Sequence, residues 1–134
     1  MSAPVNQHPN QFGVPLKTTD ATQTTTATFP TKTDRAYHVT AKVLGMKDDS
    51  ANIGVYTMVA AFKNDGGTLS LVGSIAAVAT IESDSNWAAT LDASDTDIRV
   101  RVTGVAATNI SWLTQLEVVE VGNYYANYGM AEPS

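Results

Sequence analysis

Hydrophobic and polar residues alternate along two segments in the central part of the chain. Between residues 37 and 43 every second residue is apolar, and the residues between them are His, Thr and Lys. Residues 98–103 repeat the pattern, with Arg99 and Arg101 between three branched apolar residues. A period of two is typical of a β-strand that buries one face. The pattern therefore predicts a half-buried strand at each segment.

Short apolar or threonine-rich runs predict further strands elsewhere. These runs are Ile53–Phe62, Thr68–Val72, Ile75–Ile81, Trp87–Leu91 and Ile110–Val121, with Thr22–Phe29 as a further candidate for an edge strand. The connections are rich in turn formers such as Asn64–Gly67, where Asp-Gly supplies the positive φ of a tight hairpin. The middle of the chain shows no capped helical period. We therefore expect an all-β, antiparallel β-sandwich of jelly-roll-like type, with a barrel as the alternative.

The prolines divide the chain into three zones. Four of them precede residue 31, the fifth is Pro133, and none lies between. Because proline cannot donate a hydrogen bond to a sheet, the proline-free middle suits a β domain. The first 30 residues are polar, with Lys17 and Asp20 as their charges, and hold too little apolar surface to fold alone. We expect an extended N-terminal arm at 1–32, the β-sandwich domain at 33–122 and a C-terminal tail at 123–134.

The segment Ile53–Phe62 is apolar on both sides of the predicted strand. Tyr56 and Met58 alternate there with Val55 and Val59. Each sheet of a sandwich has one inward face, so the second side needs another cover, such as an arm of the chain or a neighbouring subunit. Tyr56 and Met58 are therefore candidate partner-interface residues. The alternative is a central strand on which these two side chains are half exposed.

Arg99 and Arg101 project from one side of a predicted strand, two residues apart. Like charges in this arrangement need carboxylates opposite them. One interpretation is an ion-pair ladder within the chain, whose acidic residues offer many partners. The other is pairing with carboxylates of a neighbouring subunit, which makes both arginines candidate interface residues.

Aromatic residues gather near the C-terminal end. Tyr124, Tyr125 and Tyr128 follow the last predicted strand. Tyrosine combines a large contact area with a hydroxyl group and is enriched at interfaces. The tail either folds back on its own domain or docks on a partner. Phe12 and Phe29, in the N-terminal segment, are candidates for similar anchors.

The sequence contains no arrangement typical of a catalytic or metal site. His8 lies in a segment rich in Pro and Asn, and His38 lies on the polar side of a predicted strand. Carboxylates cluster at predicted turns, where Asp is expected, and their spacing does not follow a calcium-binding loop. These clusters are Asp48-Asp49, Glu82 with Asp84, and Asp92 with Asp95 and Asp97. We expect no enzyme activity, no catalytic residue, no cofactor and no bound metal, with calcium in an Asp-rich loop as the alternative.

Charge and composition limit the classes of partner. The net charge is −5, the isoelectric point is near 4.7, and the eight basic residues are scattered. Nucleic acids and anionic membranes need clustered Lys and Arg, so we expect neither as a partner. The chain has no Cys, which excludes disulfides and thiolate chemistry. We expect neither a secretory signal at the start nor a run of about 20 apolar residues that could span a membrane.

Four segments carry a family resemblance. They are AAFKNDGGTLSLVGS (Ala60–Ser74), WAATLDAS (Trp87–Ser94), IRVRVTGVAATNISW (Ile98–Trp112) and LEVVEVG (Leu116–Gly122). Together they resemble a β-sandwich module of virion proteins from tailed bacteriophages. The resemblance covers about Asp34 to Gly122 and rests on turn and strand motifs. It implies a homotrimeric structural protein of the virion that needs no cofactor.

A sandwich with long polar arms is similar to a capsid decoration, or cement, protein. The resemblance then implies a trimer on the capsid surface, assembled in the host cytoplasm. Its arms would clamp neighbouring major capsid protein subunits and gain affinity by attaching jointly. The alternative is a small tail-fibre or tail-tip protein that binds a receptor on the host surface. A glycan-degrading enzyme is a more distant option, because turns already explain the carboxylates.

Overall fold

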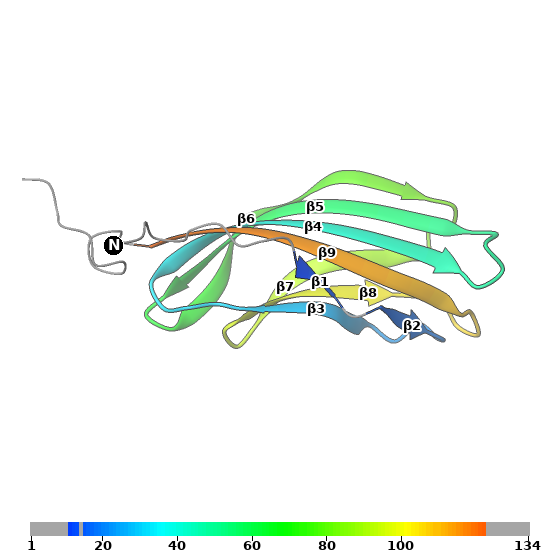
Figure 1. Cartoon of the computed structure of the whole chain (residues 1–134), viewed down its shortest axis with the longest axis horizontal. Helices are drawn as coiled ribbons and strands as arrows, with labels where there is room; N and C mark the ends of the chain where they lie inside the picture. The colour runs from blue at the N-terminus through cyan, green and yellow to red at the C-terminus, as the bar shows by residue number, and fades with distance from the viewer. Residues whose placement is uncertain (1–10, 14, 123–134) are drawn as a thin grey trace, which may run out of the picture.

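The computed structural model describes residues 11–13 and 15–122 of the chain, and these residues form an antiparallel β structure (Figure 1). The strands are β1 (Gln11–Phe12), β2 (Leu16–Thr18), β3 (Thr24–Pro30), β4 (Arg35–Lys47), β5 (Ile53–Asp65), β6 (Thr68–Glu82), β7 (Ala88–Ser94), β8 (Asp97–Thr103) and β9 (Ile110–Gly122). Every strand pair is antiparallel. The predicted all-β class is confirmed. Among the described residues, no helix is long and apolar enough to cross a membrane.

The strands form two sheets, which pack against each other as a sandwich. The larger sheet has the order β1-β9-β4-β5-β6, with β2 also pairing with β9, and the smaller sheet has the order β3-β8-β7. Figure 1 shows β4, β5 and β9 in one layer and β3 and β8 in the other. The separation into two sheets confirms the predicted sandwich and argues against the barrel.

The core lies between the two sheets and is supplied by alternate residues of the long strands. In β4 the inward residues include Val39 and Ala41, and in β8 they are Ile98, Val100 and Val102, all with no exposed surface. The sequence pattern predicted this alternation, because side chains of a strand point to opposite faces in turn. Full burial of a Val or Ile side chain contributes roughly 1.5–3 kcal/mol relative to exposure.

Aromatic side chains fill one end of this core. The rings of Trp87 and Trp112 meet edge to face with centroids 5.6 Å apart, and Tyr56 lies 6.4 Å from Trp112. Edge-to-face contacts of this kind stabilise a core beyond the area that they bury. Phe29 and Tyr37 form a similar pair, with centroids 5.8 Å apart, between the two sheets.

The segment expected to be an N-terminal arm contributes three strands to the sandwich. The predicted edge strand in its threonine-rich run is confirmed, since β3 pairs with β8. Strands β1 and β2 pair with β9, which the sequence pattern did not predict. The described part of this segment is therefore bonded to the sheets, and the sandwich begins before residue 33.

Threonine hydroxyls explain how so polar a segment can be buried. The indole N–H of Trp112 donates to the hydroxyl of Thr18 at 2.9 Å. The hydroxyls of Thr26, in β3, and Thr114, in β9, bond to each other at 2.8 Å, which links the two sheets. All three threonines are at most 5% exposed. A buried hydroxyl is tolerated when it has a hydrogen-bond partner, so low hydrophobicity did not prevent this segment from joining the core.

Two strands predicted separately form the single strand β6. The register of β6 against β5 shifts twice, and Gly73 has a φ of 71° at one of these irregularities. Glycine adopts a positive φ without strain, so it lets the chain bulge while the sheet continues. Residues 73 and 74, which separate the two predicted strands, therefore lie in a bulge within one strand.

Candidate interaction surface

The exposed large apolar side chains all belong to the larger sheet. In the described part of the chain, every one of them lies on β4, β5, β6 or β9 and is 38% to 63% exposed. They are Leu44, Met46, Ile53, Val72, Val78, Ile81, Leu113, Val119 and Val121. Except for Val78, which lies at a bulge, these residues occupy strand positions away from the core. We call this surface, the side of the larger sheet that faces away from the smaller sheet, the outer face.

Two apolar rows cross the outer face from strand to strand. In the first row Leu113 on β9 is opposite Leu44 on β4, Leu44 is opposite Val55 on β5, and Val55 is opposite Ile81 on β6. Directly opposite side chains in a sheet lie about 5 Å apart and contact one another. The row is therefore a continuous apolar strip four strands wide.

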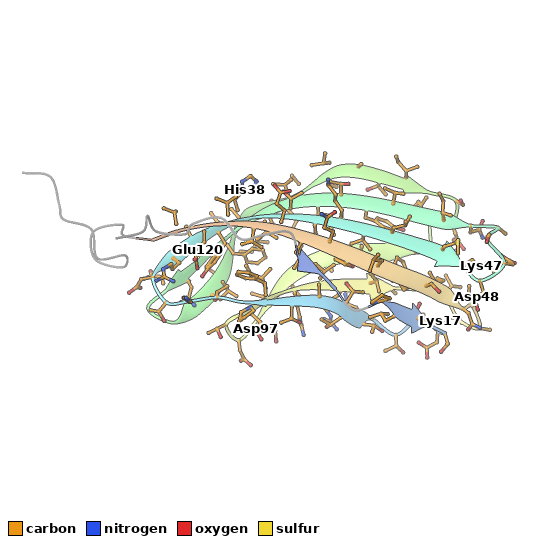
Figure 2. All side chains as sticks on the ribbon, viewed as in Figure 1. Lys17, His38, Lys47, Asp48, Asp97 and Glu120 are labelled. Carbon is orange, nitrogen blue, oxygen red and sulfur yellow. The ribbon has the colours of Figure 1, made fainter. Side chains whose placement is uncertain are left out.

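The second row lies six residues further along the strands. It runs from Val119 through His38 and Ala61 to Val72, by the same register, so its apolar side chains are interrupted at His38 on β4. Figure 2 shows His38 projecting from the larger sheet away from the smaller one. The register predicts a separation of about 20 Å between the two rows, at roughly 3.4 Å per residue.

Each row borders a shallow hollow in the surface. The hollow at the first row has a volume of about 300 Å³ and is lined by Leu44, Val55 and Leu113 among others. The hollow at the second row measures about 430 Å³, and its lining includes His38, Val72 and Val119. Both are open and mostly apolar, which suits contact with another protein surface more than enclosure of a small molecule.

On β9 and β4 a polar band separates the two rows. One row of the band contains Gln115, Lys42 and Thr57, and the next contains Glu117 and Thr40. On β5 and β6 the band gives way to Val59 and to alanines. The band thus places one positive and one negative side chain on neighbouring strands. Exposed apolar patches bordered by polar residues mark protein interaction surfaces.

Strand β6 forms one edge of this surface and carries no charged residue from Thr68 to Ile81. It pairs with β5 on one side only, and most of its residues after Leu71 are exposed. Edge strands of soluble proteins are usually short or protected by Lys or Pro. The structure shows two bulges in β6, and these hinder edge-to-edge pairing with another strand.

The outer surface of the smaller sheet differs in chemistry. Arg99 donates to both carboxylate oxygens of Asp92, at 2.6 and 3.3 Å, and Arg101 lies 3.5 Å from the same carboxylate. The hydrogen bond to Asp92 raises the pKa of Arg99. The ion-pair ladder within the chain is therefore present for both candidate arginines. Asp92 lies inside β7, so its interpretation as a turn residue was wrong.

Three other candidate interface residues belong to the core. Phe29, Tyr56 and Met58 are each 5% exposed and lie among the buried side chains. On β5 the opposite side, with half-buried Val55 and Val59, faces outward instead. Strand β5 is apolar on both sides, as the sequence pattern predicted. However, the side with Tyr56 and Met58, which was expected to meet a partner, packs against the second sheet instead.

The remaining candidates are only partly described. Phe12 lies in β1, where its backbone pairs with Gln115. Tyr124, Tyr125 and Tyr128 lie outside the described residues. Their role at an interface stays a prediction.

Two tyrosine–carboxylate pairs line the core. Tyr37 donates to Glu120 at 2.7 Å and accepts from the backbone N–H of Lys32 at 2.8 Å. Burial raises the pKa of Tyr37 to about 12. Tyr56 donates to Glu82 at 2.5 Å, and burial likewise raises its pKa. Both tyrosines thus keep their protons at neutral pH and act as hydrogen-bond donors, a structural use of the hydroxyl.

Several carboxylates bond to their own turns. Asp49 accepts from the backbone N–H of Ala51, and Asp84 accepts from that of Asn86, each at 2.9 Å. These contacts confirm the turn interpretation for both residues. No group of three or more His, Cys, Asp or Glu in the described ranges could hold a metal ion.

The known proteins similar to this chain come from solved structures. No protein-family model and no curated protein sequence matches the chain. Among solved structures, the chain is similar to the Acinetobacter baumannii phage AM24 tailspike protein, with a TM-score of 0.48, 6% identity, and coverage of 85% of this chain and 27% of that one. It is also similar to the Acinetobacter phage vB_ApiP_P1 tailspike protein, with a TM-score of 0.38, 14% identity, and coverage of 92% and 22%. The chain thus spans about a quarter of the length of either tailspike.

Proposed function

We propose that this chain is a structural module of a tailed-phage virion, built into a larger assembly through the outer face of its larger sheet. The observation that carries the proposal is that, in the described part of the chain, all the exposed large apolar side chains except Val78 lie on that one face. The resemblance of the segments between Ala60 and Gly122 to virion β-sandwich modules also supports the proposal. A virion subunit needs such a face, because it is held in place by contacts with its neighbours.

The energetics favour burial of this surface. Monomeric proteins rarely expose a contiguous apolar patch larger than about 300–600 Å². The first row, with Met46 and Ile53 beside it, is a continuous apolar strip across four strands. Covering it contributes about 25 cal/mol per Å² of apolar area removed from water. The exposed outer face is therefore a docking surface in this proposal.

Within the virion, we favour a place in the tail over a place on the capsid. A cement protein was expected because residues 1–32 could act as a clamp. Residues 16–18 and 24–30 are instead strands bonded to β9 and β8. Much of the arm is thus not free to spread over major capsid protein subunits. In this proposal the outer face attaches the chain to its neighbours, as expected for a module stacked within a tail appendage.

Fractionation of the phage that encodes the chain tests this function. Virions would be purified, heads and tails separated, and the protein quantified in each fraction by mass spectrometry. We expect it to copurify with tails at a fixed ratio to other tail proteins. Recovery with heads would overturn the tail assignment and favour capsid decoration. Recovery in the soluble lysate only would overturn the virion function.

A matched pair of variants connects the function to the outer face. Leu44→Lys with Ile81→Lys places two charges in the first apolar row, at positions 51% and 63% exposed. We expect virions to lose this protein. The control, Ser85→Lys with Thr96→Lys, adds the same charge at exposed positions off the outer face and should be incorporated normally. Equal incorporation of both variants would show that the outer face is not the attachment surface.

A further inference from the structure

When the outer face is rotated by a half turn about a line across its strands, each row of side chains takes the place of another row. Its two apolar rows lie on either side of the polar band, and the band is two rows deep. The row of Gln115 and Lys42 is next to the first apolar row, and the row of Glu117 and Thr40 is next to the second. A line across the strands between these two polar rows is equally distant from both apolar rows.

We propose that the outer face packs against the outer face of a second copy of this chain, about a two-fold axis along that line. The inference rests on the proposed function, since it names the partner of the same surface, and it replaces the homotrimer implied by the family resemblance with a two-fold pair. Rotation about the axis lays the first row of each copy on the second row of the other. Ile81 then meets Val72 of the second copy, Val55 meets its Ala61, and Leu44 meets its His38. Two sheets stacked in this way lie about 10 Å apart, as in a sandwich core.

The charges on the outer face complement each other under the same rotation. Lys42 is placed over Thr40 of the second copy, one strand away from its Glu117, a spacing of about 4.8 Å. The symmetry forms this Lys–Glu contact twice. A two-fold interface is self-complementary by necessity, and Lys42 with Glu117 gives this face one charge of each sign on neighbouring strands for such a contact.

Overall charge also favours approach through this face. The chain carries a net charge of −5, so two copies repel each other on average. On β9, β4, β5 and β6 of the outer face, Lys42 and Lys63 balance Glu117 and Asp65. The copies can therefore meet here without the repulsion that acidic surfaces produce.

The area is sufficient for a stable pair. A face four strands wide and six side-chain rows long has a plan area of roughly 800 Å². About 800 Å² from each partner is the size of a standard specific interface. The bulges of β6 do not obstruct this arrangement, because face-to-face packing needs no hydrogen bonds along the strand edge.

The mass of the full chain in solution tests the proposal. Sedimentation equilibrium at micromolar concentrations should give about twice 14.2 kDa. Leu44→Lys with Ile81→Lys should raise the dissociation constant at least about 30-fold, the size of an interface hot-spot loss. Ser85→Lys with Thr96→Lys should leave it unchanged. Circular dichroism would confirm that all variants are folded.

A charge exchange separates this interface from general stickiness. Lys42→Glu should weaken the pair, because it faces Glu117 of the second copy, and the double variant Lys42→Glu with Glu117→Lys should restore it. Failure of the double variant to restore the pair would overturn the proposed axis.

A stable monomer, a mass of three chains, or a dimer insensitive to Leu44→Lys with Ile81→Lys would each overturn the proposal. The outcomes are distinguishable from those of the virion test. A monomer that is nevertheless found in tails contradicts only the pairing, and a pair that is absent from particles contradicts only the virion function.

Discussion

The six-membered ring of Trp112 lies over the backbone of Gly45, so that a Cβ atom at residue 45 would be 2.7 Å from the ring carbon Cζ3. Gly45 lies on the inward side of β4, and Trp112 is directly opposite it on β9. Trp112 is 2% exposed and touches Trp87 and Tyr56. The absence of a side chain at residue 45 is what gives this large ring its place in the core.

Gly45→Ala should therefore destabilise the fold. The added methyl group must displace a ring held on several sides, and overpacking of this kind typically costs about 1–3 kcal/mol. Urea unfolding followed by tryptophan fluorescence would measure the free energy of unfolding. Ser74→Ala, on the exposed part of β6, is the control and should change it by less than about 0.5 kcal/mol. Equal effects would mean that the contact with Trp112 is not tight.

Thr18→Val should destabilise the fold although the two side chains have the same shape. It removes the acceptor for the indole N–H of Trp112, a buried donor, and such a loss costs about 1–3 kcal/mol. The neighbouring residue Thr19 is exposed, so Thr19→Val is a matched control with little expected effect. If both variants unfold at the same urea concentration, β2 is not part of the cooperative domain.

Asp92→Asn should have a small effect. The carboxylate is one-third exposed and pairs with Arg99 and Arg101 on the surface of the smaller sheet. Ion pairs in such positions contribute about 0–1 kcal/mol and are screened by salt. The difference from wild type should shrink in high salt, and Asp95→Asn in the adjacent turn serves as the control. A loss well above this range that persists in salt would show a larger role for these arginines, such as pairing with a neighbouring subunit.

Alkaline pH should weaken the fold through Tyr37. Its pKa is raised from 10.0 to about 12 in the folded chain, chiefly by burial, with the backbone N–H of Lys32 acting in the opposite direction and Glu120 adding to the rise. A raised pKa favours folding fully below pH 10, and this contribution is lost as the pH rises through 12, because the unfolded chain releases the proton first. Urea midpoints measured across pH 9 to 12 should fall.

Tyr37→Phe is the control for this titration. Phenylalanine cannot ionise, so the variant should lose less stability than wild type between pH 10 and 12. Below pH 10 it should be less stable than wild type by about 1 kcal/mol, because the hydrogen bond to Glu120 is gone. Parallel pH profiles for the two proteins would assign the alkaline loss to other groups, such as Tyr56.

Strand positions with strict alternation were predictable because the signal is local. Residues 37–43 and 98–103 show their buried side in the sequence, and the structure buries the side that was expected. The turn at Asn64–Gly67 was equally readable, since Gly66 and Gly67 have positive φ values, as a tight hairpin requires.

The sequence by itself thus determined the β class, the long alternating strands and the hairpin turns, because each depends on residues close together in the chain. Tertiary structure decided which side of β5 enters the core, since both sides are apolar and a period of two does not name the inward one. It also decided the place of the N-terminal segment, because Thr18 and Thr26 are buried only when Trp112 and Thr114 supply their hydrogen bonds. The outer face arose in the same way, when the pairing of β9, β4, β5 and β6 joined apolar residues that are scattered along the sequence into two rows.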